Sequence, residues 1–352
     1  MRDLVALEAG TPAIFDPELV DAARRAMSAN SWRALRADMR VFRNWCGETG
    51  CSNAPASPQT VARFLRAQGD AGKKAATLAR YASSIARIHA MADWPDPTRT
   101  ELVRLELKAQ RRALGVRQRQ ARGLRFRGEV ADPLAAAGPV GVSVEAMLAA
   151  ASGAPLRIAR DRALLSLAFD TGLRRSEIVA VLWRHVEPGS GEGGRLFVPR
   201  HKADQEAAGS YAFLSPRTMA FLKEWKAIAA IAEGAVFRRL HRSRDRDGED
   251  IWSVGAQLSA QSVTLTYRAM LDGARAAGLL DALDDAQYAD WRRALTAHST
   301  RVGLTQDLFA SGQDLAGIMQ ALRWKSPAQP ARYAQALSVE SNAAAKVVGL
   351  LE

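Results

Sequence analysis

Hydrophobic residues in the first third of the chain recur at the spacing of amphipathic helices. Between residues 31 and 46, large apolar side chains from Trp32 to Trp45 return every three or four positions, which places them on one helix face. Similar patterns run over 58–68, 74–91 and 101–114, and Pro95 and Pro97 interrupt them. The pattern predicts an all-helical first domain over residues 1–115, which begins with a loose arm over 1–15.

The rest of the chain combines helical periodicity with one pair of alternating segments. Two short β-like runs, 195–200 and 211–214, flank a polar loop and predict a hairpin. The fold class expected is therefore mainly α with a small β-hairpin or sheet, and the second domain spans 142–352. Its predicted helices are 144–151, 159–169, 174–183, 216–232, 262–277, 297–311, 315–322, 330–336 and 340–351.

Length and composition agree with two globular domains. The chain has 352 residues, more than one core usually organises, and 48% of them are hydrophobic, which is ample for burial. Cys46 and Cys51 are too far apart for a Cys-x-x-Cys site, so we expect neither a disulfide nor a zinc site. No apolar run reaches about 18 residues, so we expect no membrane partner and a cytoplasmic protein associated with the nucleoid.

The charge of the chain points to a polyanionic partner. The net charge is +12, and ten Lys and Arg residues face two acids between Arg99 and Arg127. An excess of this size favours a nucleic acid, although an Arg-rich proteome is the alternative. Glycine and proline cluster before Gly141, so residues 116–141 are predicted to form a basic linker that lies along phosphates.

Two pairs of residues in the second domain have the spacing of one helix face. Arg174 and Glu177 are three residues apart, so the carboxylate can orient a guanidinium that clamps phosphate oxygens. His298 and Arg301 have the same spacing near a predicted helix N-terminus, where an anion is favoured. Taken singly, Arg174 and Glu177 are better interpreted as a surface ion pair, and His298 as a helix-capping histidine.

Three further residues could carry chemistry. Lys202 lies in the hairpin loop, where it could protonate a leaving oxygen, although loop lysines are usually solvated. The indole of Trp324 could donate to a phosphate, although a tryptophan is usually part of a core. Tyr333 follows nine residues later, and a tyrosine in that context is usually half-buried.

The order of these residues along the chain is more specific than any one of them. An Arg–Glu pair, a hairpin lysine, a His-x-x-Arg motif, a tryptophan and a tyrosine follow one another. In this order the chain resembles the tyrosine recombinases over nearly its whole length, most closely over 297–303, 318–324 and 347–352. Most members of the family carry histidine where Trp324 stands, so the tryptophan marks a smaller subgroup. The chain departs from the family over 127–141 and in much of the first domain, which leaves the DNA target open.

The resemblance implies an enzyme that cuts and rejoins DNA strands. Tyr333 would attack the scissile phosphate to form a 3′-phosphotyrosyl link, and recombination would pass through a Holliday junction. Lys202 would be the general acid and Glu177 would orient the first arginine. Neither a metal nor ATP nor another cofactor is implied. The phosphate oxygens would be held by Arg174, His298, Arg301 and Trp324.

The resemblance also implies how the chain meets its partners. A two-domain, C-shaped clamp would close on double-stranded DNA that carries an inverted-repeat recombination site. A homotetramer would form on DNA through exchange of the C-terminal helix. Ordinary solvated surface is the alternative for three of the predicted DNA contacts, namely Arg33, Arg80 and Gln261. The full set expected to contact DNA is Arg33, Arg80, Arg117, Arg119, Arg122, Arg125 and Gln261.

Three rival functions share parts of this pattern. A type IB topoisomerase uses similar chemistry to relax supercoils, and a telomere resolvase would produce hairpin ends. A catalytically inactive DNA-binding protein is a third alternative, and the complete set of residues argues against it.

Overall fold

The computed structural model describes residues 15–115, 120–130, 133–134, 138–151, 153–199 and 209–334. The chain divides into two compact units, Met1–Arg119 and Gln120–Glu352. Each unit has its own core of buried hydrophobic residues. The predicted arm over 1–15 lies outside the described residues, apart from Phe15.

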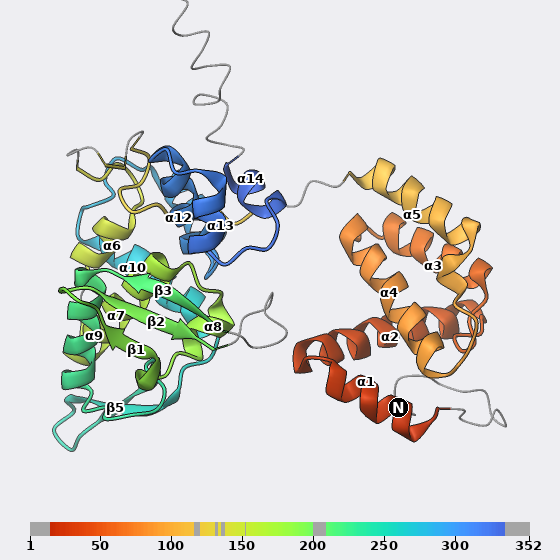
Figure 1. Ribbon diagram of the computed structural model, residues 1–352, viewed down its shortest axis with the longest axis horizontal. Coiled ribbons are helices and arrows are strands. Elements are labelled where there is room, and N and C mark those ends of the chain that lie inside the picture. Colours follow the sequence, from red (N-terminus) through yellow and green to blue (C-terminus); the bar gives the residue numbers. More distant parts are fainter. Residues whose placement is uncertain are drawn as a thin grey trace, which may run out of the picture. The chain divides into compact units, whose positions relative to one another are not determined.

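The first unit is a helical bundle, as the hydrophobic spacing predicts (Figure 1). Its core is aromatic at the centre, where the rings of Phe42 and Phe64 lie 4.9 Å apart and those of Phe64 and Tyr81 lie 5.4 Å apart. Ser28 and Ser57 cap the N-termini of the second and third helices by accepting backbone N–H bonds. The helices are α1 (Pro17–Ala26), α2 (Ala29–Thr49), α3 (Pro58–Asp70), α4 (Ala75–Met91) and α5 (Glu101–Leu114).

The second unit is built around one helix that is buried on nearly all sides. This helix, α7 (Pro155–Thr171), contacts α6, α9, α10, α12 and β3. Its residues from Ala163 to Ala168 are all buried, which is typical of the central helix of a core. The helices around it are α6 (Val144–Ala149), α8 (Arg175–Val179), α9 (Pro216–Ile228), α10 (Ser262–Ala276), α11 (Asp285–Ala294), α12 (Ser299–Ala310), α13 (Leu315–Ala321) and α14 (Ala328–Ala334).

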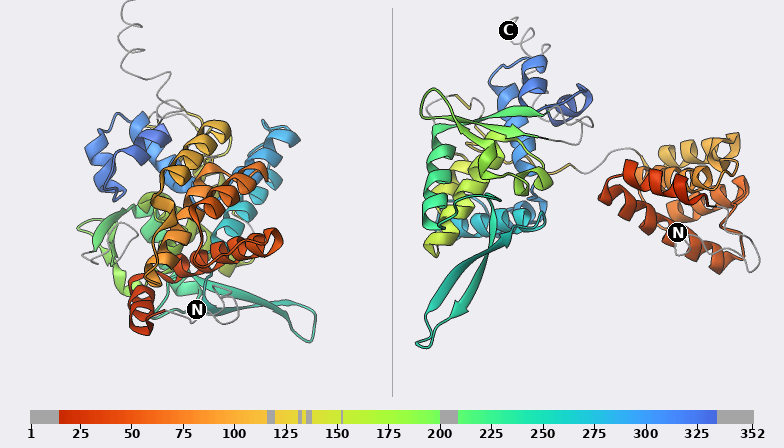
Figure 2. Two further views of the ribbon diagram at one scale, coloured as in Figure 1. Left: turned by 90° about the vertical axis from the view of Figure 1, so that its right-hand side faces the viewer. Right: turned by 60° about the horizontal axis from the view of Figure 1, so that its bottom comes forward.

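Two antiparallel sheets complete the second unit. The predicted hairpin is confirmed as β2 (Gly194–Val198) and β3 (Ser210–Leu214), and β1 (Val186–Pro188) adds a third strand beside β2. A second hairpin, β4 (Arg238–Arg244) with β5 (Asp250–Gln257), was not predicted, and it projects from the unit (Figure 2). The predicted helix over 174–183 is shorter, because α8 ends at Val179 and a 3₁₀ turn follows at Trp183–His185.

The boundary between the units lies earlier than the sequence indicated. Residues 120–130 were expected to belong to a linker over 116–141, but they pack against α12 as part of the second unit. The N–H of Leu124 donates to the carbonyl of Ser299 at 2.9 Å, and Leu124 is fully buried. Gly303 allows this approach, since a Cβ there would collide with the backbone of Leu124. Only residues 116–119 of the expected linker fall in the first unit, and these lie outside the described residues.

Candidate active site

The first part of the site is the end of α7 and the start of α8. Gly172 ends α7 with a φ of 55°, and a Cβ there would also meet the side chain of Leu322. Arg174 follows at the N-cap of α8. Its Nη1 donates to Oε1 of Glu177 and its backbone N–H donates to Oε2, each at 2.9 Å. The predicted pair is therefore present, with a buried carboxylate that fixes a partly exposed guanidinium.

The second part of the site is the start of α12. His298 is the N-cap of this helix and Arg301 lies in its first turn, so they share one end of the helix as predicted. Arg301 is only 1% exposed. Its Nη1 donates to the carbonyl of Gly172 at 2.5 Å, and its Nη2 donates to the carbonyl of Leu322 at 2.6 Å. The arginine thus joins α12 to the end of α7 and to the turn after α13.

The third part of the site is the segment from α13 to α14, which carries Trp324 and Tyr333. Nε2 of His298 and the hydroxyl oxygen of Tyr333 are 2.7 Å apart, which is a hydrogen-bond distance. The Trp324 ring lies 5.7 Å from the Tyr333 ring, and the guanidinium of Arg301 lies 4.5 Å from the Trp324 ring. The helices α12, α13 and α14 contact one another, as Figure 1 shows. Arg174 and Tyr333, which are 159 positions apart in the sequence, therefore belong to one site.

The site is strongly electropositive, and this controls its proton chemistry. Burial lowers the pKa of His298 to about 4, and the charges of Arg301 and Arg174 act in the same direction. Burial raises the pKa of Tyr333, although Arg301 and Arg174 oppose that rise. At neutral pH the structure thus holds a neutral imidazole against a protonated phenol, which is the arrangement that general-base activation of a nucleophile needs.

The arginines remain cations in spite of their burial. Burial, together with the charges of Arg174 and Arg323, lowers the pKa of Arg301 to about 9, which still leaves it protonated at neutral pH. Burial acts to raise the pKa of Glu177, but the backbone N–H and the guanidinium of Arg174 outweigh it, so the pKa lies below its ordinary value. One carboxylate therefore sits among three arginines, and an anion that enters the site would meet a net positive charge.

Arg323 is a residue of the site that the sequence did not reveal. It is 8% exposed, and its Nη2 donates to the carbonyl of Thr171 at 2.6 Å. Burial lowers its pKa. Nothing in the local sequence distinguishes this arginine from the chain's many solvated ones, so only the fold could place it here.

Three of the predicted DNA contacts, Arg33, Arg80 and Gln261, differ in their surroundings. Arg33 is exposed on α2, where its Nη2 donates to Asn30 at 2.6 Å, and Gln261 is the exposed N-cap of α10. Arg80 instead makes a bidentate pair with Asp38, at 3.0 and 2.8 Å. Asp38 is only 2% exposed, and a buried carboxylate needs a cation beside it. Arg80 is therefore oriented towards Asp38 and neutralises its charge. The arginine remains half-exposed, with 55% of its side-chain surface open to solvent.

The predicted phosphate-binding linker needs a correction. Arg125 is 8% exposed, and its Nε donates to Asp307 of α12 at 2.6 Å, so it is an internal ion pair and not a surface cation. Arg122 lies with its guanidinium 3.8 Å from the Trp291 ring and pairs with Glu129. Arg117, Arg119 and Lys202 lie outside the described residues.

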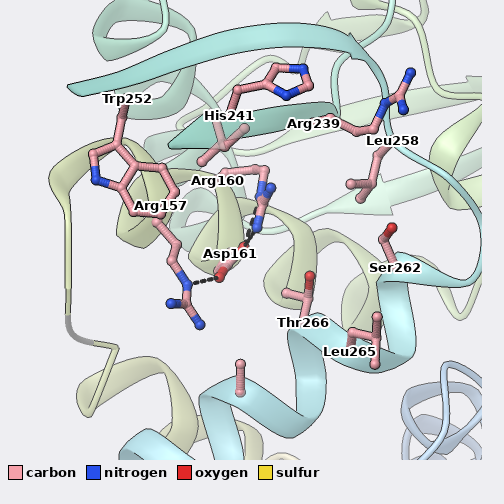
Figure 3. A pocket seen from close by; sticks show the side chains of 12 residues that line it. Arg157, Arg160, Asp161, Arg239, His241, Trp252, Leu258, Ser262, Leu265 and Thr266 are labelled. Atoms are coloured by element: carbon pink, nitrogen blue, oxygen red, sulfur yellow. Dashed lines mark hydrogen bonds and ion pairs between the residues drawn. The ribbon is translucent and has the colours of Figure 1, made fainter. Parts of the chain in front are cut away.

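A cavity of about 510 Å³ lies apart from these residues, between α7, α10 and the β4–β5 hairpin. Arg157 and Arg160 of α7 both pair with Asp161, while His241 and Trp252 of the hairpin lie across the cavity from them (Figure 3). None of the predicted catalytic residues that the structure describes lines it. It borders the start of α10, which carries Gln261, and so it belongs to the surroundings of that candidate contact.

Comparison with known proteins decides the family. Residues 142–339 match the phage integrase family, and residues 22–94 match the N-terminal SAM-like domain of phage integrases. The chain belongs to the phage integrase family, whose members are the tyrosine recombinases. The matched ranges contain every candidate catalytic residue from Arg174 to Tyr333, and the resemblance stated from the sequence is confirmed.

Two curated relatives cover most of the chain. A XerD-homologue integrase/recombinase of Selenomonas ruminantium is 26% identical over 88% of this chain and 82% of its own length. The recombinase Cre of Escherichia phage P1 is 24% identical over 94% of this chain and 90% of its own length.

Solved structures share the fold. The XerH recombinase, in a post-cleavage complex with a palindromic difH substrate, has a TM-score of 0.55 at 16% identity, over 93% of this chain and 83% of that one. The Tn1549 transposon integrase, in complex with a circular intermediate DNA, has a TM-score of 0.51 at 11% identity, over 90% of this chain and 93% of that one.

Two features are absent from the described residues. No helix there is long and apolar enough to span a membrane. No group of His, Cys, Asp and Glu gathers there closely enough to hold a metal ion.

Proposed function

We propose that this tyrosine recombinase cleaves and rejoins DNA at a specific site through Tyr333. The observation that carries the proposal is the 2.7 Å contact between Nε2 of His298 and the Tyr333 hydroxyl, beside Arg174 and Arg301. A neutral base against a nucleophile, inside a cluster of guanidiniums, fits attack on a phosphodiester. The relatives named as recombinases support the choice of DNA as the substrate.

The reaction begins with the Tyr333 oxygen attacking the scissile phosphorus. A bond forms between tyrosine and phosphorus, and the phosphorus bond to the 5′-oxygen breaks, which leaves a 3′-phosphotyrosyl link and a 5′-hydroxyl. The tyrosine proton passes to His298. Burial and the two arginines depress the pKa of this histidine, and the negative charge of a bound phosphate raises it by offsetting the arginines.

The remaining residues stabilise charge and supply a proton. Arg174, Arg301 and the Trp324 indole act on the phosphate oxygens, where negative charge develops during attack. Glu177 orients Arg174, and Lys202 protonates the leaving 5′-oxygen. The guanidiniums supply the positive charge that a metal ion supplies in other phosphoryl-transfer enzymes, and the phosphotyrosyl link conserves the bond energy. The reaction therefore needs neither a metal nor ATP.

Site specificity comes from the two units acting together. The units clamp opposite faces of a duplex that carries inverted repeats, and Arg33 and Gln261 read base edges from α2 and α10. Four protomers assemble on two duplexes through their C-terminal helices, and strand exchange passes through a Holliday junction. Phosphate contacts position such a protein on the duplex, and base contacts give it specificity.

A two-plasmid assay tests the proposal and separates it from its rivals. DNA that flanks the gene is footprinted with the protein, and the protected sequence is cloned into two plasmids of different size. We expect plasmid fusion and a transient four-way junction, both dependent on the cloned site. Relaxation of any supercoiled plasmid without fusion would indicate a type IB topoisomerase. Hairpin ends would indicate a telomere resolvase, and protection without cleavage an inactive DNA-binding protein.

A further inference from the structure

The turn after α13 holds an arginine in a backbone conformation that favours glycine. Arg323 has a φ of 55°. The N–H groups of Arg323 and Trp324 donate to the carbonyls of Gln320 and Met319, at 3.2 and 2.9 Å. This pair of bonds ends many helices, and its left-handed residue is usually glycine because a Cβ is strained there. Arg323 thus bears a conformational cost that glycine would avoid.

The side chain of Arg323 carries a second cost, because it is buried. Only 8% of the residue is exposed, and burial lowers the pKa of its guanidinium. Its Nη2 donates to the carbonyl of Thr171 at 2.6 Å, and its Nη1 donates to that of Ala321 at 3.3 Å. Strained residues that their surroundings hold in place are common at functional sites. Glycine would suit the backbone of this turn better, so a role for Arg323 must lie in its side chain.

Two arginines occupy the free carbonyls at the end of α7. Thr171 accepts from Arg323, and the next carbonyl, that of Gly172, accepts from Arg301 at 2.5 Å. The last carbonyls of a helix lack partners within the helix and carry partial negative charge, so guanidinium donors suit them. Arg301 also donates to the carbonyl of Leu322 at 2.6 Å. The end of α7, the start of α12 and the turn at 322–324 are therefore tied together.

We propose that Arg323 is a positioning residue for strand cleavage. By holding the 322–324 turn against the end of α7, it fixes two things: the Leu322 carbonyl that anchors Arg301, and the Trp324 ring that lies 4.5 Å from the Arg301 guanidinium. The Trp324 ring in turn lies 5.7 Å from the ring of Tyr333. The inference rests on the function proposed above. A displacement of about 1 Å at such a site can slow a reaction by about 100-fold.

The chain offers a matched control for the substitution of Arg323. Ala230 follows α9 with a φ of 49°. The N–H groups of Ala230 and Ile231 donate to the carbonyls of Ala227 and Lys226, at 3.2 and 3.1 Å, which is the same helix-ending motif. Arg323→Gly and Ala230→Gly relieve the same backbone strain, but only the first removes a guanidinium from the site.

The experiment measures the first-order rate of covalent adduct formation on saturating DNA, together with the Kd for that DNA. For Arg323→Gly we expect the rate to fall by about 10- to 100-fold with an unchanged Kd. Arg323→Lys, which keeps a charged donor, should recover part of the rate, and Ala230→Gly should react at the wild-type rate. Thermal unfolding establishes the folded fraction of each variant at the assay temperature.

A second readout does not depend on activity. In protein labelled with 5-fluorotryptophan, the ¹⁹F resonance of Trp324 is assigned as the one that Trp324→Phe removes. It should shift or broaden in Arg323→Gly and stay in place in Ala230→Gly. A wild-type rate for Arg323→Gly, a loss that only follows the folded fraction, or an unchanged Trp324 resonance overturns the inference. Absence of an adduct from wild-type protein would instead contradict the proposed function.

Discussion

At the scale of single residues, the depressed pKa of His298 is the property most closely linked to the chemistry. Its folded pKa of about 4 lies below the ordinary 6.5, so between these values the folded protein binds fewer protons than the unfolded chain. The free energy of unfolding therefore falls as the pH drops from about 6.5 towards 4. A histidine of this kind is neutral throughout the physiological range.

We predict that an NMR titration of the free protein will give His298 a midpoint near pH 4, with its signal assigned from His298→Gln. Bound DNA should move the midpoint upward, because a phosphate neutralises the neighbouring arginines. A midpoint near 6.5 in the free protein would mean that the imidazole is solvated and that the arginines do not act on it.

Lys202→Ala should slow strand cleavage by about 10²- to 10⁴-fold, the usual effect of losing a general acid. When sulfur replaces the 5′-bridging oxygen of the substrate, the leaving group departs without needing a proton. This substrate should therefore restore the rate of the variant. Cleavage of normal and sulfur-containing DNA is followed side by side. Lys223→Ala, on α9, is the control and should behave as wild type on both. If sulfur gives no rescue, Lys202 has another role.

At the scale of elements, the sequence predicts what periodicity can encode. The helices α2 to α5 of the first unit, and the β2–β3 hairpin, agree with their patterns because one face of each is buried. The β4–β5 hairpin was missed because both strands are mostly exposed, and because β4 is a run rich in arginine that lacks alternation. Its turn at Asp247-Gly248 was an available signal. Helix α11 was also not predicted, and the capping box of Asp284 and Gln287 was an available signal for it.

Contacts between distant elements cannot be inferred from local patterns, and Arg125 illustrates this. The charge run that contains it indicates a surface, yet Asp307, 182 residues away, draws it into the second unit. The candidate catalytic residues were chosen from their order along the chain. Arg323 belongs to no such order, and its position depends on a left-handed turn that the sequence does not signal.

We predict that Arg125→Met destabilises the protein by about 3–5 kcal/mol, since it leaves Asp307 buried without its cation. The dependence of DNA affinity on salt should not change. Thermal unfolding and binding at several salt concentrations measure the two effects. Arg111→Met, which removes an exposed arginine of α5, should leave stability within about 0.5 kcal/mol of wild type. If Arg125→Met has the stability of wild type and its DNA affinity depends less on salt, Arg125 contacts DNA and the internal ion pair is not its main role.

At the scale of the whole molecule, the proposed assembly involves residues 341–352, which lie outside the described part of the chain. Their sequence predicts a helix with an apolar stripe of Ala344, Val347, Val348 and Leu351. A helix this short is marginal alone, so the stripe needs a partner surface. Donation of the helix from each protomer to the next would close a ring.

Truncation after Leu337 should leave single-site binding intact and abolish both the tetramer on DNA and recombination. Light scattering of the protein with paired sites measures the assembly. Val348→Lys, which places a charge in the stripe, should act like the truncation, whereas Lys346→Ala, on the opposite face, should not. Tetramers formed by the truncated chain would contradict exchange of the helix.

The identity of the covalent linkage is the most direct test of the account. Wild-type protein is incubated with its DNA site in excess EDTA, denatured, digested with protease, and the peptide that retains DNA is sequenced by mass spectrometry. We predict a 3′-phosphate joined to Tyr333, no adduct from Tyr333→Phe, and unchanged DNA affinity in that variant. An adduct at another residue, an adduct from Tyr333→Phe, or cleavage that requires added magnesium would contradict the account.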